Sequence, residues 1–120
     1  MNRKIRIFKV LLVASVLCFG TISYAQDVIV LDDNQSMSIT GKGPGQDAAI
    51  NPYIGSDSYA IIKNIAGAPF EARVQQNGKI ISIVKILRGK EVKLKLLKGH
   101  ELYFDSTKKS KVSIKFEKAE

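Results

Sequence analysis

Apolar and polar residues alternate along much of the chain, most clearly in residues 90–97 and 111–118. In the first segment, Val92 and Leu94 fall on one side of an extended backbone and Lys93 falls on the other. Because successive side chains of a strand point to opposite faces, this period of two predicts strands with one buried and one solvated face. We therefore expect both segments to be half-buried β-strands.

Six further segments have the composition of strands, and no segment has a convincing helical periodicity. Residues 79–87 (KIISIVKIL) are apolar on both faces and rich in β-branched side chains. Such a run favours a central strand covered from both sides, or one near a partly covered face. The other strand candidates are residues 28–31, 35–40, 58–65, 70–76 and 100–104.

Turn signals separate these segments. The dipeptide Asn77-Gly78 readily adopts the positive φ angles of a type I′ turn, which predicts a hairpin between residues 70–76 and 79–87. Further turn signals recur about every ten residues, as is typical of antiparallel sandwiches and barrels. We predict an all-β fold, a small antiparallel two-sheet sandwich of seven or eight strands, immunoglobulin-like in architecture. The Cys, Trp, Cys pattern of antibody domains is absent after residue 25.

The first 25 residues have the anatomy of a secretory signal. Four basic residues without an acidic one precede an apolar run of eleven at residues 10–20, and Ser23 and Ala25 stand at the small-residue positions of a cleavage site. A membrane anchor would need about 17 to 25 apolar residues. A lipoprotein signal through Cys18 is disfavoured because Leu17 precedes it. We expect cleavage near Ala25, export to the periplasm or the extracellular space, and one domain over residues 26–120 without a transmembrane span.

Cleavage would remove the only cysteine and four of the nineteen basic residues. The exported chain would then have no disulfide, no thiol nucleophile and no thiolate metal ligand. Its charge is uneven, because residues 26–70 carry a net charge of −3 and residues 71–120 carry +7. This asymmetry is compatible with an anionic partner, or with ordinary lysines on the solvated face of a small β-protein.

The sequence offers little material for catalysis. The only histidine, His100, follows a Lys-Gly turn signal, where we expect it to be an exposed turn residue. The aspartate pairs Asp32 with Asp33 and Asp47 with Asp57 could in principle serve as acid and base. Adjacent aspartates before Asn and Gln are more typical of a turn. We therefore expect no enzymatic activity.

Metal, cofactor and nucleic-acid sites are also disfavoured. Asp47, Asn51 and Asp57 could provide oxygen ligands for calcium, but their spacing matches no calcium-binding loop. Single-strand binders interleave basic and aromatic residues, whereas residues 26–120 contain only two arginines, Arg73 and Arg88, and three tyrosines. We expect no metal, no cofactor and no nucleic-acid partner.

The segment 41–59, GKGPGQDAAINPYIGSDSY, differs in composition from the rest of the chain. Loops beyond about 12 to 15 residues are uncommon in compact domains unless they are functional or disordered. We interpret this one as a loop pinned to the sandwich. Two alternatives stay open: a plain crossover pinned by Ile50 and Tyr53, or a polar recognition surface for a sugar or a peptide backbone. The candidate binding residues are Gln46, Asp47, Asn51, Tyr53 and Asp57.

A second candidate surface is formed by the outward lysines of the last strands. Lys93, Lys95 and Lys115 are predicted to stand side by side and to face an anion such as an acidic glycan, unless they form an ordinary solvated face.

Together these features predict an exported, noncatalytic interaction module that recognises a carbohydrate or protein partner through loop 41–59. The alternative is a structural or chaperone-like protein that pairs a strand edge with an extracellular partner, for which residues 28–31 are the candidate edge. The sequence leaves the oligomeric state open.

Overall fold

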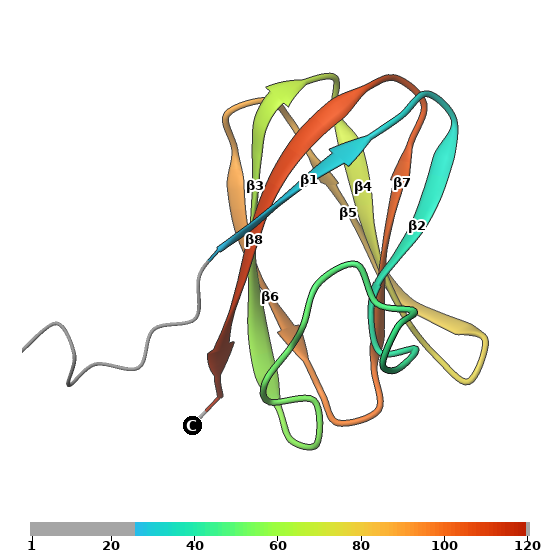
Figure 1. Cartoon of the computed structure of the whole chain (residues 1–120), viewed down its shortest axis with the longest axis vertical. Helices are drawn as coiled ribbons and strands as arrows, with labels where there is room; N and C mark the ends of the chain where they lie inside the picture. The colour runs from blue at the N-terminus through green and yellow to red at the C-terminus, as the bar shows by residue number, and fades with distance from the viewer. Residues whose placement is uncertain (1–25, 120) are drawn as a thin grey trace, which may run out of the picture.

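A computed structural model describes residues 26–119 as two antiparallel sheets of four strands each, without a helix (Figure 1). This arrangement confirms the predicted all-β sandwich. The predicted signal sequence lies outside the described residues, and within them no helix is long and apolar enough to span a membrane. The strands are β1 Asp27–Leu31, β2 Gln35–Thr40, β3 Ser58–Gly67, β4 Phe70–Gln76, β5 Lys79–Ile86, β6 Glu91–Leu96, β7 Glu101–Ser106 and β8 Ser110–Lys118.

The strand order is β1-β8-β3-β6 in one sheet and β2-β7-β4-β5 in the other. Apart from β4 and β5, consecutive strands belong to opposite sheets. Eight antiparallel strands connected in this way form a jelly roll, a double-sheet fold made of two Greek keys. The immunoglobulin comparison holds for the two-sheet architecture and does not extend to the connectivity, because the first two strands of an immunoglobulin domain pair within one sheet.

The hairpin between β4 and β5 turns at Asn77 and Gly78, whose φ angles are 52° and 80°. Two positive φ angles in succession are the mark of a type I′ turn, so the predicted hairpin is confirmed. One extra residue, Ile81, interrupts the pairing and forms a β-bulge opposite Val74 and Gln75.

The inward faces of both sheets form one apolar core. The rings of Phe70 and Phe104 meet across neighbouring strands with centroids 5.0 Å apart. The predicted alternation holds for most of β8, where Val112 and Ile114 are buried and Lys115 is exposed, but the polar Ser113 is buried as well. The largest fully buried apolar side chains are Phe70, Phe104, Leu31, Ile39, Ile62, Ile86, Leu102, Ile114, Val74 and Val112.

One strand prediction is wrong. The apolar segment 79–87 was expected in the middle of a sheet or near a partly covered face, but β5 is an edge strand that pairs only with β4. Its side chains Ile80, Ile81 and Ile83 are each at least half exposed. A strand that is apolar on both faces normally has neighbours on both sides. In β5 this composition therefore leaves exposed apolar surface at an unpaired edge.

Candidate functional site

The loop between β2 and β3 crosses from one sheet to the other and folds against the free edge of β2 (Figure 1, green). The amide of Ala48 donates to the carbonyl oxygen of Ser38 at 3.3 Å, and the amide of Ala49 donates to Ile39 at 3.0 Å. The Ala49 side chain is buried in the core. Backbone pairing and burial therefore fix the middle of the loop on the sandwich.

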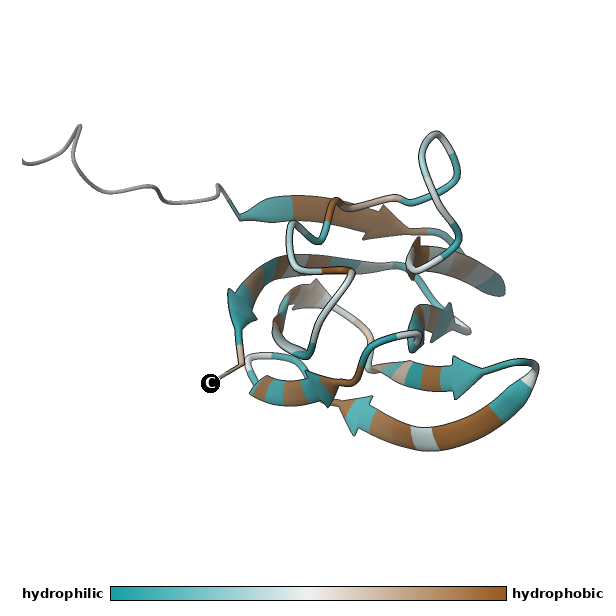
Figure 2. Cartoon of the chain, turned by 90° about the horizontal axis from the view of Figure 1, so that it is seen from below, coloured by the Kyte–Doolittle hydropathy of each residue, from teal (hydrophilic) through white to brown (hydrophobic). Residues whose placement is uncertain are grey.

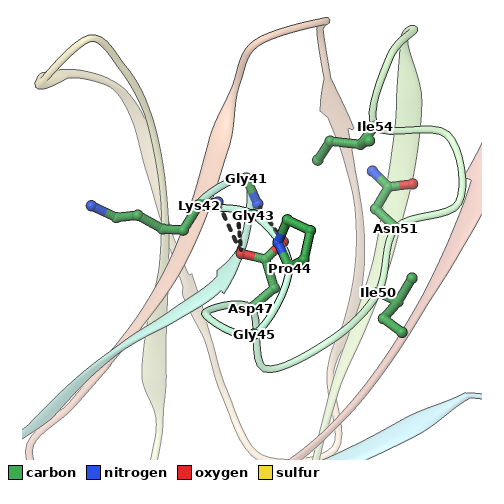
Figure 3. A pocket seen from close by; sticks show the side chains of 9 residues that line it. All are labelled: Gly41, Lys42, Gly43, Pro44, Gly45, Asp47, Ile50, Asn51 and Ile54. Carbon is green, nitrogen blue, oxygen red and sulfur yellow. Dashed lines mark hydrogen bonds between the residues drawn. The ribbon is translucent and has the colours of Figure 1, made fainter.

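Asp47 organises the glycine-rich start of the loop. Its carboxylate accepts hydrogen bonds from the backbone amides of Gly41, Lys42 and Gly43 at 3.1, 2.9 and 3.1 Å (Figure 3). It also accepts a longer hydrogen bond, of 3.4 Å, from the Thr40 hydroxyl. Consecutive amides that converge in this way form an anion-binding nest. Here the anion is the chain's own carboxylate, so the Asp47 oxygens are already occupied.

Asn51 fixes the second half of the loop in the same manner. Its side chain is only 7% exposed, donates to the Ser58 hydroxyl at 3.0 Å, and accepts from the Tyr53 amide at 2.9 Å. The Tyr53 side chain is half-buried and packs against the core. These contacts make Asn51 and Tyr53 part of the frame that holds the loop.

The two remaining candidate residues lie at different places on the loop. The Asp57 carboxylate accepts from the Lys98 amide at 3.0 Å and so ties the loop to the turn after β6. Gln46 is exposed, and its backbone amide donates to the carbonyl oxygen of Gly43 at 3.0 Å. All five predicted binding residues thus lie on one folded loop, and Asp47, Asn51 and Asp57 bond to neighbouring groups of the chain itself.

A hollow of about 490 Å³ opens beside this frame (Figure 3). Two apolar side chains on its wall are exposed to solvent, Ile50 at 81% and Ile54 at 48%. The Lys42 side chain points away from the hollow (Figure 3), toward the Tyr103 ring, whose centroid lies 5.7 Å from the Lys42 ammonium. The hollow is lined by Gly41, Lys42, Gly43, Pro44, Gly45, Asp47, Ile50, Asn51 and Ile54.

The apolar members of this hollow were not among the predicted binding residues. Ile50 was expected to pin the loop on the sandwich, but it is the most exposed large apolar residue of the described chain. Ala49, its neighbour, is the residue that is buried. Ile54 lies between turn-forming residues, and an isoleucine in such a place was the sequence signal that could have indicated a surface site.

The predicted lysine face is found on the outer side of the β1-β8-β3-β6 sheet. Lys93 and Lys115 stand on either side of Ile61 in β3. The Lys93 ammonium lies 3.5 Å from a Glu117 carboxylate oxygen and 4.6 Å from the centroid of the Tyr59 ring. The structure therefore brings the lysines together on one face, where apolar, aromatic and acidic side chains are interspersed among them.

His100 is not the exposed turn residue that was expected. It is only 9% exposed, its Nδ1 atom accepts from the Leu97 amide at 3.1 Å, and its own amide donates to the Leu97 carbonyl oxygen. The imidazole therefore closes the turn between β6 and β7. Among residues 26–119, no group of three or more His, Cys, Asp or Glu side chains is placed to hold a metal ion.

The outer face of the other sheet carries a polar cluster that the sequence did not reveal. The Arg73 guanidinium donates to both carboxylate oxygens of Asp105, at 2.8 and 3.0 Å, and stacks 4.4 Å from the centroid of the Tyr103 ring. Ser36 donates to Asp105 at 2.7 Å. Hydrogen bonding from Arg73 holds the pKa of Asp105 below its ordinary value.

No family model and no curated protein matches the chain. Among solved structures, a chain described as "Bacillus endospore appendages form a novel family of disulfide-linked pili" aligns at 9% identity with a TM-score of 0.48, covering 82% of this chain and 99% of that one.

Proposed function

We propose that the chain is an exported, noncatalytic interaction module. It takes an apolar side chain of a protein partner into the hollow beside the loop between β2 and β3, which spans residues 41–57 in the structure. The observation that carries this proposal is the exposure of Ile50 and Ile54 on a loop whose backbone is tied down by Asp47 and Asn51. Scaffolded loops commonly carry binding functions. A loop that is already ordered also loses less conformational entropy when it binds.

The chemistry of the hollow favours a protein over a carbohydrate. Sugar recognition needs polar groups with free hydrogen-bonding capacity, but the Asp47 carboxylate and the Asn51 amide already bond to the loop. The accessible surface of the hollow is therefore largely aliphatic, and Ile50 and Ile54 are its most exposed apolar side chains. Covering these two side chains provides the favourable free energy of apolar burial, about 25 cal/mol for each Å² removed from water.

The proposal is tested with peptides selected against the purified chain from a displayed random library, and with a panel of neutral and acidic oligosaccharides. Amide chemical shifts in NMR titrations locate each binding site. We expect selected peptides to contain an exposed apolar anchor and to shift the amides of residues 41–54. The double variant Ile50→Ser/Ile54→Ser should weaken binding by roughly tenfold or more, equivalent to 1.4 kcal/mol.

The control variant is Ile65→Ser, which removes an exposed isoleucine from the outer face of β3 and should leave the affinity unchanged. Oligosaccharides that shift the amides of the loop while peptides do not would overturn the choice of a protein partner. Peptides that shift the amide signals only of residues outside the loop would show that residues 41–57 connect two strands and protect the edge of β2, and do not form a binding site.

A further inference from the structure

The sandwich has four edge strands, and two of them are protected against pairing with another chain. The carbonyl oxygens of Ser38 and Ile39 on the free side of β2 accept hydrogen bonds from Ala48 and Ala49 of the long loop. The β6 edge presents Glu91, Lys93 and Lys95 at alternate positions. Covering loops and charged side chains are the usual means by which β-proteins prevent edge-to-edge association.

The other two edges, β1 and β5, are open. Within the described residues each pairs on one side only, β1 with β8 and β5 with β4. Both expose apolar side chains: Val28 and Val30 on β1 are 52% and 59% exposed, and the three outer isoleucines of β5 are 50 to 57% exposed. In Figure 2 the two apolar strands lie on opposite sides of the molecule, β1 at the top and β5 at the bottom.

The charges at the ends of these two strands are complementary. Asp27 and Asp32 flank the apolar residues of β1, and Lys79 and Lys85 flank the exposed isoleucines of β5. None of these four side chains forms an ion pair within the described part of the chain.

The spacing of the charges matches as well. Lys79 and Lys85 stand opposite Gln76 and Glu71 of β4, five positions apart along the sheet, because the bulge at Ile81 absorbs one residue. Asp27 and Asp32 are also five positions apart. At about 3.4 Å per residue, the charges of the two edges therefore lie at the same separation.

We infer that β5 of one copy pairs with β1 of a second copy of this chain. Pairing satisfies the unpaired backbone groups of both edges, packs valines of β1 beside isoleucines of β5, and sets one lysine near one aspartate at each end. The joined sheet has the order β2-β7-β4-β5-β1-β8-β3-β6, with its halves from different copies. This contact goes beyond the function proposed for the loop and does not depend on it.

The symmetry of this contact has a consequence for assembly. Two different edges meet, so the contact is heterologous, and each copy keeps one free β1 and one free β5 after pairing. Such contacts extend into open chains unless the rotation between copies closes a ring. The expected product is a concentration-dependent series of oligomers and not a single dimer.

Charge reversal tests the pairing directly in residues 26–120, which contain all eight strands. One variant is Asp27→Lys/Asp32→Lys, with two basic edges, and the other is Lys79→Glu/Lys85→Glu, with two acidic edges. Sedimentation velocity should show that the wild type gains mass with concentration and that each variant associates at least tenfold more weakly. An equimolar mixture of the two variants should recover the association of the wild type, because each basic edge then meets an acidic one.

The matched control is Lys63→Glu/Lys115→Glu, which reverses two exposed lysines of the central strands β3 and β8, on the outer face of the β1-β8-β3-β6 sheet, and should associate like the wild type. Hydrogen exchange should also slow at residues of β1 and β5 as concentration rises. A wild type that stays monomeric up to about millimolar concentration would overturn the proposal, and so would a mixture that fails to associate. Loss of association in only one of the two variants would instead indicate a contact that does not join β5 to β1, and would also refute the proposal.

Discussion

Asp47 is the residue on which the order of the long loop depends most. Its two oxygens bind three successive amides, so one side chain replaces the backbone partners that a strand or helix would have supplied. The Asn51 side chain does the same for the backbone amide of Tyr53, and it also donates to the Ser58 hydroxyl. The side chains of Asp and Asn can bond to neighbouring backbone groups of their own loop, and they can also bind a ligand. Residue type alone cannot distinguish the two uses, because the distinction depends on which amides lie within reach.

Replacing Asp47 with alanine should therefore disorder the loop. The amides of residues 41–43 lose their acceptor, and because they are half-exposed, water replaces part of the interaction. We expect the free energy of unfolding to fall by about 1 to 2 kcal/mol, and the exchange of these amides to accelerate. Denaturant titration and hydrogen exchange measure the two effects. Gln46→Ala, a neighbouring change at an exposed side chain, should stay within about 0.5 kcal/mol of the wild type.

The pair formed by Arg73 and Asp105 should make stability depend on pH. Because the folded pKa of Asp105 is lowered by Arg73, its contribution is fully present above the unfolded pKa of about 3.9 and is lost as pH falls through the folded value. Asp105→Asn should cost about 1 kcal/mol at pH 7, and the difference from the wild type should shrink below pH 4. Denaturant titrations from pH 7 to pH 2 measure this.

A double-mutant cycle with Arg73→Met identifies the cause of that pH dependence. The coupling energy between the two sites should be favourable at pH 7 and should vanish in acid. A difference between Asp105→Asn and the wild type that stays constant at all pH values would show that the carboxylate contributes through its shape or its neutral hydrogen bonds, and not through its charge.

At the scale of elements, the sequence was sufficient to indicate all eight strands, two of them by the alternation of apolar and polar residues and the other six by composition and turn signals. The clearest case was β6, where the charged side chains are exposed and the apolar ones are at least partly buried, and β8 follows the same pattern except at its buried serines. The position of β5 could not be read in the same way. Periodicity reports which faces of a strand are apolar and says nothing of what covers them. For β5, the apolar outer face indicates a surface that another chain can cover.

Substitutions at two glycines measure how far the backbone geometry depends on the conformational freedom of glycine. Gly78 lies in the hairpin between β4 and β5, and Gly67 ends β3 just before the chain crosses to β4. Gly78 and Gly67 both have positive φ angles, 80° and 93°. A Cβ atom at Gly78 would meet no atom within 4 Å, whereas one at Gly67 would lie 2.5 Å from the carbonyl oxygen of Lys109. We expect Gly78→Ala to cost about 1 kcal/mol from the strained dihedral alone.

Gly67→Ala adds a clash with the backbone just before β8 and should cost clearly more, about 3 kcal/mol in total. Thermal and denaturant unfolding of the two variants gives the comparison. Equal losses in both would show that β3 and the turn before β8 move apart easily, and would contradict the close packing described at that crossover.

At the scale of the whole molecule, the order of the strands in the two sheets could not be predicted from the sequence. Only the hairpin between β4 and β5 joins neighbours in one sheet, and its Asn77-Gly78 turn was recognised. The remaining turns carry the chain from one sheet to the other. A turn signal marks a reversal of direction without indicating whether the next strand pairs with the last one or packs over it. The uneven charge of the two halves was visible, but the opposition between an acidic β1 edge and a basic β5 edge appears only in the fold.

Because the charges of the β1 and β5 edges are opposite, we expect the association of copies and the stability of the single chain to respond differently to salt. Exposed charges interact over about 10 Å at 0.1 M ionic strength and about 3 Å at 1 M. The charged ends of β1 and β5 should attract one another strongly at low salt and weakly at high salt. Stability of the single chain rests on the apolar core and should change by less than about 0.5 kcal/mol over the same range, since exposed ion pairs contribute little.

We therefore expect the mass-average mass at fixed protein concentration to fall as sodium chloride rises from about 0.05 to 0.5 M, while the denaturation midpoint of dilute protein stays nearly constant. Sedimentation velocity and denaturant titration give the two curves. The control is the equimolar mixture of the two charge-reversed variants, which should show the same dependence on salt as the wild type. A mass that instead grows with salt would mean that the exposed valines and isoleucines drive association without help from the charges, because salt strengthens apolar burial and screens ion pairs. The exposed strand edges would then associate through apolar contacts alone, without a preference of β5 for β1. The head-to-tail order of the copies would have no physical basis.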